Sequence, residues 1–190
     1  MSSVIEVEVK FRIEDLERLT ERLRTAGFRL ITPRTHEINT LFDFPDRSLR
    51  KQGLLLRLRK YGERWTVTFK GKAAPGRYKS RTEVETTVQD GEAMAVIFES
   101  VGFSRVFTYE KFRTEWSDGQ GHVVLDETPI GNFGEIEGSG EWIESAARKL
   151  QISPEQYITD SYATLFQKWK DANGSKAVNM CFAEIKADST

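Results

Sequence analysis

Apolar and polar residues alternate along most of this chain with a period of two, which is typical of β-strands. Eight segments follow this pattern and have the composition of strands: 4–12, 28–44, 53–61, 63–71, 78–88, 103–117, 121–128 and 131–138. Turn-forming sequences such as Tyr61-Gly62-Glu63 lie between several of them. Short turns of this kind connect neighbouring antiparallel strands, so the pattern predicts a mostly antiparallel sheet.

In four places the apolar spacing lengthens to the helical period of three or four residues. These predicted helices lie at about 14–26, at about 90–100, after Gly140 and after Asp160. Each predicted helix has an apolar face, which we expect to pack against the sheet. No period continues beyond Asp171, so residues 1–170 are predicted to form a single domain and residues 171–190 a loose C-terminal tail.

Composition narrows the class of protein. The chain has 190 residues, of which 38% are hydrophobic and 30% charged, enough apolar material for a folded domain. No apolar run approaches the roughly 20 residues that cross a bilayer, and the amino terminus lacks the pattern of a secretory signal. We therefore expect no membrane partner and a cytoplasmic location.

The single cysteine, Cys181, excludes an internal disulfide and, with only two histidines, a structural zinc site. Twenty-eight basic residues against 29 acidic ones give a net charge of −1, which removes the overall electrostatic case for nucleic-acid binding. The sequence leaves the oligomeric state open, with a homodimer among the alternatives.

Charged residues two positions apart recur on the predicted strands, and such residues share one face of a strand. In chain order the sets are Glu6, Glu8 and Lys10; Arg57 and Arg59; Arg81, Glu83 and Glu85; Lys111 and Arg113; Glu135 and Glu137, with Lys70 and Asp126 on strands between them. For each set alone, a solvated sheet face remains an adequate explanation, because water and salt screen the repulsion. The whole series favours a closed barrel of about eight strands with these charges inside and helices packed outside.

Charges enclosed in a barrel need partners, because an unpaired charge away from water is costly. A phosphate chain with divalent cations would supply partners of both signs. Paired carboxylates coordinate Mg²⁺ or Mn²⁺, and arginine and lysine bind phosphate oxygens through charge-assisted hydrogen bonds. The pattern therefore indicates a small molecule that carries a phosphate chain.

The segment Glu6-Val-Glu-Val-Lys10 resembles the E-x-E-x-K signature of the CYTH superfamily, the triphosphate tunnel metalloenzymes. That superfamily includes class IV adenylyl cyclases, thiamine triphosphatases and inorganic tripolyphosphatases. Further motifs follow in order: Asn39-Thr-Leu-Phe-Asp43, Leu56-Arg-Leu-Arg59, Thr66-Val-Thr-Phe-Lys70, Arg81-Thr-Glu-Val-Glu85, Lys111-Phe-Arg113, Leu125-Asp126, Gly134-Glu-Ile-Glu137 and Ser161-Tyr162. The resemblance implies an α+β fold in which an eight-stranded antiparallel tunnel holds a triphosphate and a divalent metal.

The resemblance also implies roles for individual residues. The expected metal ligands, for Mg²⁺ or Mn²⁺, are Glu6, Glu8, Asp126, Glu135 and Glu137. The expected triphosphate-binding residues are Lys10, Arg57, Arg59, Lys70 and Arg113, the first four also as catalytic residues, with Arg81, Glu83, Glu85 and Lys111 at further substrate-binding positions. Two departures stand out: Leu41 replaces a tyrosine that assists hydrolysis in some members, and Ser161 replaces a lysine that precedes the final tyrosine.

Three functions remain in view. The leading hypothesis is a metal-dependent hydrolase of triphosphate compounds, such as inorganic tripolyphosphate, thiamine triphosphate or a nucleoside triphosphate. The alternative is a class IV adenylyl cyclase, in which the ribose 3′ hydroxyl of ATP attacks the α-phosphorus and releases pyrophosphate. A non-catalytic polyphosphate-binding module is the third, and the complete set of carboxylates argues against it.

Overall fold

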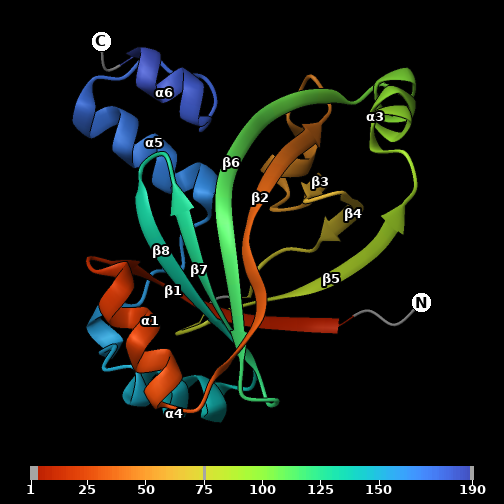
Figure 1. The fold of residues 1–190 in the computed structure, drawn as a ribbon. Helices are drawn as coiled ribbons and strands as arrows, with labels where there is room; N and C mark the ends of the chain where they lie inside the picture. Colours follow the sequence, from red (N-terminus) through yellow and green to blue (C-terminus); the bar gives the residue numbers. More distant parts are fainter. Residues whose placement is uncertain (1–3, 75, 189–190) are drawn as a thin grey trace.

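The computed structural model of the protein describes residues 4–74 and 76–188 (Figure 1). Its strands are β1 Val4–Ile13, β2 Arg29–Asp43, β3 Leu55–Tyr61, β4 Arg64–Lys70, β5 Lys79–Val88, β6 Ser104–Ser117, β7 His122–Thr128 and β8 Gly131–Glu137. They close into an antiparallel barrel in the order β1-β5-β4-β3-β2-β6-β7-β8. The predicted eight-stranded barrel is confirmed, with each strand in its expected part of the sequence.

Four longer helices lie where the sequence predicts them: α1 Leu16–Thr25, α3 Gly91–Ser100, α4 Gly140–Lys149 and α5 Tyr162–Asn173. An Asp or Ser side chain caps the first turn of each by accepting a backbone hydrogen bond. Three further elements escaped prediction: α2 Ser48–Lys51, the 3₁₀ turn Pro154–Gln156 and α6 Phe182–Asp188. Elements this short contain too few turns to show a helical period.

The segment after Asp171, which the sequence predicts as a loose tail, contains residues that are buried and hydrogen-bonded to the barrel. Met180 is completely buried and Ile185, on α6, is 7% exposed. The amide of Met180 donates to the carbonyl of Thr108 at 3.0 Å, and its carbonyl accepts from the amide of Glu110 at 3.0 Å. The chain is thus hydrogen-bonded to β6 at Met180 and buried again at Ile185. These two residues lie on an isolated β-bridge and on a short helix, where apolar residues need not be periodic.

Two apolar clusters cover the outside of the barrel. Helices α1 and α4 pack against β1, β6, β7 and β8 through residues that include Leu23, Ile143, Val9, Trp116 and Ile136. Helix α3 packs against the β2, β3 and β4 side around Ala95, Phe42 and Leu58. Figure 1 shows these two layers on different sides of the strands. Both clusters bury the residues that alternate with the charged ones, which leaves the charges on the inner face.

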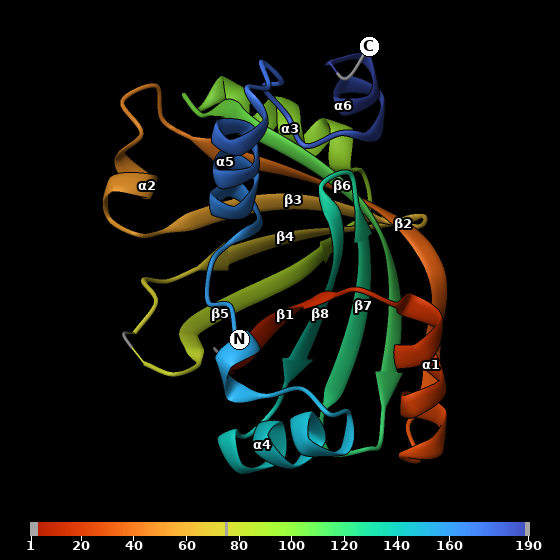
Figure 2. The same cartoon turned by 90° about the vertical axis from the view of Figure 1, so that its left-hand side faces the viewer.

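Helix α5 has a different position from the other helices. Its Leu165 and Phe166 pack against Tyr109 of β6 and Phe133 of β8. Tyr109 and Phe133 are two positions from Lys111 and Glu135, so they share the inner face of their strands. Figures 1 and 2 both place α5 and α6 at one end of the barrel and α1 and α4 at the other. Helix α5 therefore covers apolar residues of the inner face at one end of the barrel.

Candidate functional site

The strand register brings the charges of neighbouring strands to the same face. In the β1–β8 pair Glu8 lies opposite Glu137 and Lys10 opposite Glu135, while Val9, opposite Ile136, is buried in the outer core. The same alternation places Arg113 opposite Asp126, and Lys70 opposite Glu83. Residues directly opposite on antiparallel strands point to one side of the sheet, so these charged pairs face the interior of the barrel.

The basic residues inside the barrel are unusually well buried. The exposed fractions are 3% for Lys10, 5% for Lys70, 2% for Lys111 and 8% for Arg57. Lysine and arginine are almost never buried to this extent without a charged partner. These four side chains come from β1, β4, β6 and β3, so cations from much of the barrel wall converge in its interior.

Asp126 on β7 anchors one side of this interior. Its completely buried carboxylate accepts hydrogen bonds from Lys111 at 2.9 Å, from Arg113 at 2.6 Å and from the hydroxyl of Tyr162 at 2.6 Å. Tyr162 opens α5, so the hydrogen bond ties that helix to the charged interior. Burial and the carboxylate of Asp126 raise the pKa of Tyr162 well above its ordinary value, which keeps the hydroxyl protonated as a donor.

Lys10 and Glu135 form a buried ion pair, and Glu135 also accepts a hydrogen bond from Arg113. Burial opposes the charge on Lys10, but the carboxylates of Glu135 and Glu8 outweigh it and raise the pKa of the lysine. Burial likewise opposes ionisation of Glu135, but Lys10 and Arg113 hold its pKa well below the ordinary value. Both groups are therefore charged at neutral pH.

Lys70 joins β4 to two carboxylates, at 2.8 Å from Glu6 and 2.6 Å from Glu83. Burial opposes the charge on Glu6, but the ammonium group of Lys70 dominates and lowers the pKa of Glu6 to about 2. Burial and the neighbouring Glu6 raise the pKa of Glu83. Arg81 lies 3.5 Å from Glu6, and Lys79 lies 2.6 Å from Glu8. Each of these carboxylates already has a cationic partner.

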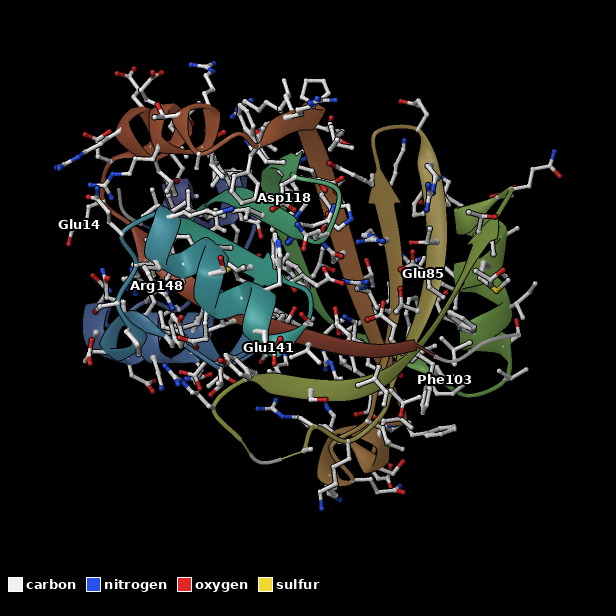
Figure 3. The ribbon with its side chains drawn as sticks, turned by 90° about the horizontal axis from the view of Figure 1, so that it is seen from below. Glu14, Glu85, Phe103, Asp118, Glu141 and Arg148 are labelled. Carbon is white, nitrogen blue, oxygen red and sulfur yellow. The ribbon has the colours of Figure 1, made fainter. Side chains whose placement is uncertain are left out.

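Arg57 and Arg59 of β3 share the carboxylate of Glu85, at 3.5 Å and 3.0 Å respectively. Arg57 also donates to the hydroxyl of Thr68 at 3.1 Å. Figure 3 shows Glu85 beside the hairpin that β3 and β4 form. The structure thus brings every predicted phosphate-binding residue to one interior, where each contacts a carboxylate.

A divalent cation would need the acidic side chains of this interior. Within residues 4–74 and 76–188, no three Asp, Glu, His or Cys side chains converge as a ready ligand set. The electrostatics nevertheless fit a cation: partial burial of its carboxyl group and the carboxylates of Glu6, Glu8 and Glu135 raise the pKa of Glu137, an exposed residue at the end of β8, to about 7. Carboxylate oxygens that repel one another are the hard ligands that Mg²⁺ and Mn²⁺ prefer.

The sequence analysis missed three residues of this interior. Glu37 and Asn39 of β2 are completely buried and hydrogen-bonded to each other through their side chains. Lys79 forms an ion pair with Glu8. Glu37 and Asn39 lie two positions apart on the longest predicted strand, the same signal that identified the other charged faces. Asn39 carries no charge, so the pair did not register as a charged set.

Outside the barrel, hollows of about 410 and 500 Å³ border the carboxyl-terminal end of α4 and share Gln151 in their walls. Neither is lined by any predicted site residue. In the part of the chain that the structure describes, no helix is both long and apolar enough to span a bilayer.

Comparisons with a family model and with the sequences of known proteins agree on one family. The model of the CYTH domain matches residues 4–162. "Putative adenylate cyclase MJ0240" of Methanocaldococcus jannaschii is 30% identical over 173 residues, which cover 85% of this chain and 98% of that protein. Adenylate cyclase CyaB of Aeromonas hydrophila is 26% identical, over 90% of this chain and 93% of that protein.

Solved structures share the fold at lower identity. A "putative adenylate cyclase" of Vibrio parahaemolyticus aligns with a TM-score of 0.79 and 20% identity, over 87% of this chain and 99% of that one. HpAC1 of Hippeastrum, described as a "putative adenylyl cyclase" that "reveals a dominant triphosphatase activity", aligns with a TM-score of 0.62 and 16% identity, over 90% and 96%. By the match over residues 4–162 and the identity to its archaeal relative, the chain belongs to the CYTH domain family.

Proposed function

We propose that this protein binds a triphosphate compound and a divalent cation, Mg²⁺ or Mn²⁺, inside the barrel and hydrolyses the terminal phosphate. The observation that carries the proposal is the convergence of Lys10, Lys70, Lys111, Arg57 and Arg113 in a buried interior. Buried cations in this number contribute little to stability compared with apolar residues, so binding of a polyanion accounts for them better.

Fixed positive charge is also what phosphoryl transfer requires. Arg57, Arg59, Lys70 and Arg113 would bind the phosphate oxygens and stabilise the negative charge that develops in the transition state. Glu6, Glu8, Glu135 and Glu137 would hold the cation, which supplies further charge neutralisation when bound. Asp126 differs from them because it is completely buried and accepts a hydrogen bond from the hydroxyl of Tyr162 in addition to those from Lys111 and Arg113. We propose that Asp126 orients these two cations.

Hydrolysis fits the interior better than cyclisation of ATP does. A cyclase must also hold a purine, which calls for an apolar or amide-lined pocket. The apolar part of the inner face, at Tyr109 and Phe133, is filled by Leu165 and Phe166 of α5. The remaining inner surface is mostly charged and suits a phosphate chain rather than a base.

Adenylyl cyclase activity remains the second candidate, because the two sequence relatives above carry that name. Product analysis separates the two reactions. The protein is incubated with tripolyphosphate, thiamine triphosphate and ATP in Mg²⁺ and in Mn²⁺, and every product is identified. We expect orthophosphate as the main product. Cyclic AMP and pyrophosphate from ATP would instead establish the cyclase, and no turnover of any substrate would reject both.

A further inference from the structure

Glu37 of β2 is a buried carboxylate at the centre of the basic side chains. Its oxygens lie 3.3 Å from Lys111, 3.9 Å from Arg113 and 4.0 Å from Arg59. Its exposed fraction is zero. Three of the cations expected to bind phosphate therefore surround a carboxylate that belongs to the protein itself.

The carboxylate of Glu37 is held in place and ionised. The side-chain amide of Asn39 donates a hydrogen bond to it at 2.8 Å, and a carboxylate can only accept, so the amide nitrogen must face Glu37. Burial opposes the charge, but Lys111, Arg113, Arg59 and Arg57 outweigh it and hold the pKa of Glu37 far below its ordinary value. Glu37 therefore keeps its negative charge at any pH near neutrality.

Two other carboxylates that pair with the basic residues, Glu83 and Glu85, have more freedom, whereas Asp126 is as completely buried as Glu37. The side chain of Glu85 is 26% exposed and that of Glu83 is 18% exposed, so either has a route to solvent when a phosphate takes its arginine or lysine. Glu37 has no such route, because its side chain is enclosed on every side. A phosphate chain that enters the barrel must therefore bind beside an anion that stays.

We propose that Glu37 makes triphosphate binding depend on a divalent cation: the fixed carboxylate repels a free triphosphate and admits the metal complex, whose net charge is smaller. The inference rests on the proposed function above and deepens it, since it defines the charge of the species that this site accepts. Glu37 acts through Lys111, Arg113 and Arg59 and is a positioning and specificity residue rather than a catalytic one.

Binding, rather than turnover, tests this role. The dissociation constant of tripolyphosphate is measured by calorimetry in excess chelator and again in saturating Mg²⁺, for the wild-type protein and for Glu37→Gln. Glutamine keeps the shape and the hydrogen bond to Asn39 and removes the charge. At an effective dielectric constant of about 20, loss of one charge close to the phosphates should strengthen metal-free binding on the order of 10-fold or more. Binding of the Mg²⁺ complex should strengthen less, so the ratio of the metal-free dissociation constant to that of the Mg²⁺ complex should fall.

Glu115→Gln is the matched control. Glu115 is two positions beyond Arg113 on the same face of β6, is partly exposed and accepts a hydrogen bond from Thr32 at 2.9 Å. Its side chain is bonded to Thr32 and is not surrounded by the phosphate-binding cations, so its neutralisation should leave the preference within about threefold of wild type. An equal effect of Glu115→Gln and Glu37→Gln would overturn a specific role for Glu37.

The outcomes separate the two proposals. If wild type binds tripolyphosphate and Glu37→Gln keeps the full preference for the Mg²⁺ complex, the role of Glu37 is refuted while the proposed function stands. If wild type binds neither form, the proposed function fails, and this inference with it. Should Glu37→Gln not fold, the double variant Glu37→Met, Asn39→Leu removes the same charge together with its hydrogen-bond partner, so that no buried polar group is left unpaired. Its preference for the metal complex should also fall, and an unchanged preference would refute the role.

Discussion

The hydroxyl of Tyr162 offers a direct test of how α5 is coupled to the charged interior. It donates to the completely buried carboxylate of Asp126 at 2.6 Å, and the same carboxylate binds Lys111 and Arg113. Tyr162→Phe removes this donor and keeps the ring, which packs near Tyr109 and Phe133 with centroid distances of 5.8 Å in both cases. The variant therefore isolates one hydrogen bond.

A hydrogen bond to a charged group is worth about 1.5 to 3 kcal/mol when its loss leaves a buried acceptor short of a partner. In a protein of 190 residues, each kcal/mol changes Tm by roughly 2 to 4 °C. We expect Tyr162→Phe to unfold about 3 to 12 °C below wild type. The pKa of Tyr162 is raised well above its ordinary value, so the hydroxyl remains a donor at pH 10 and the difference should persist there.

Thermal unfolding is followed by circular dichroism in chelator, at pH 7 and at pH 10. Tyr157→Phe serves as the control, because the buried hydroxyl of Tyr157 has no hydrogen-bond partner among the described residues. Its removal should change Tm by less than about 2 °C. A Tyr162→Phe variant as stable as wild type would show that Asp126 does not depend on this hydroxyl, and the proposed link between α5 and the interior would fail.

Three further predictions concern ligand, metal and pH. Tripolyphosphate with Mg²⁺ at 100 times its dissociation constant should stabilise the fold by about 2.7 kcal/mol, and Arg57→Ala should lose most of that gain in a thermal-shift assay; a full gain in the variant would place Arg57 outside the binding site. Hydrolysis should stop in excess chelator and fall roughly 10 to 1,000-fold in Glu6→Gln, measured as orthophosphate release; activity unaffected by chelator would contradict the role of the carboxylates. Because the pKa of Glu137 is raised to about 7, its ionisation in the folded state opposes stability as pH rises from about 4.5 to 7. Glu137→Gln should therefore match the Tm of metal-free wild type at pH 4.5 and exceed it at pH 8, where the substitution should add up to about 1 kcal/mol to the free energy of unfolding after solvent screening; a lower Tm at pH 8 would refute the repulsion between Glu137 and its neighbouring carboxylates.

The barrel could be predicted from the sequence because each strand has an apolar outer face against a charged inner one. Val9 between Glu8 and Lys10, and Leu58 between Arg57 and Arg59, are both buried in outer clusters. In any strand with one apolar and one charged face, the two residue types alternate along the sequence, so the pattern can be recognised without the structure. The whole series of charged pairs also favoured a shared interior, although a solvated sheet face remained an adequate explanation for each set alone.

Other parts of the structure depend on contacts that no local period contains. The position of α5 follows from lumen-facing Tyr109 and Phe133, which look like ordinary strand residues in the sequence. Glu37 differs from the predicted carboxylates because its neighbour on the same face is the uncharged Asn39. Which carboxylate pairs with which cation depends on strand order, and β1 lies between β5 and β8 only once the barrel is closed.

The charge balance of the interior explains why phosphate and metal should bind together. Lys70 holds Glu6 and Glu83, and Lys10 holds Glu135, so the ligand-free barrel is neutralised by its own side chains. A phosphate that takes Lys70 as its partner leaves Glu6 with Arg81, at 3.5 Å, as its remaining cation. A divalent cation at Glu6 would restore the lost neutralisation and leave the lysine available to the phosphate. Linkage is reciprocal, so each ligand must raise the affinity for the other by the same factor.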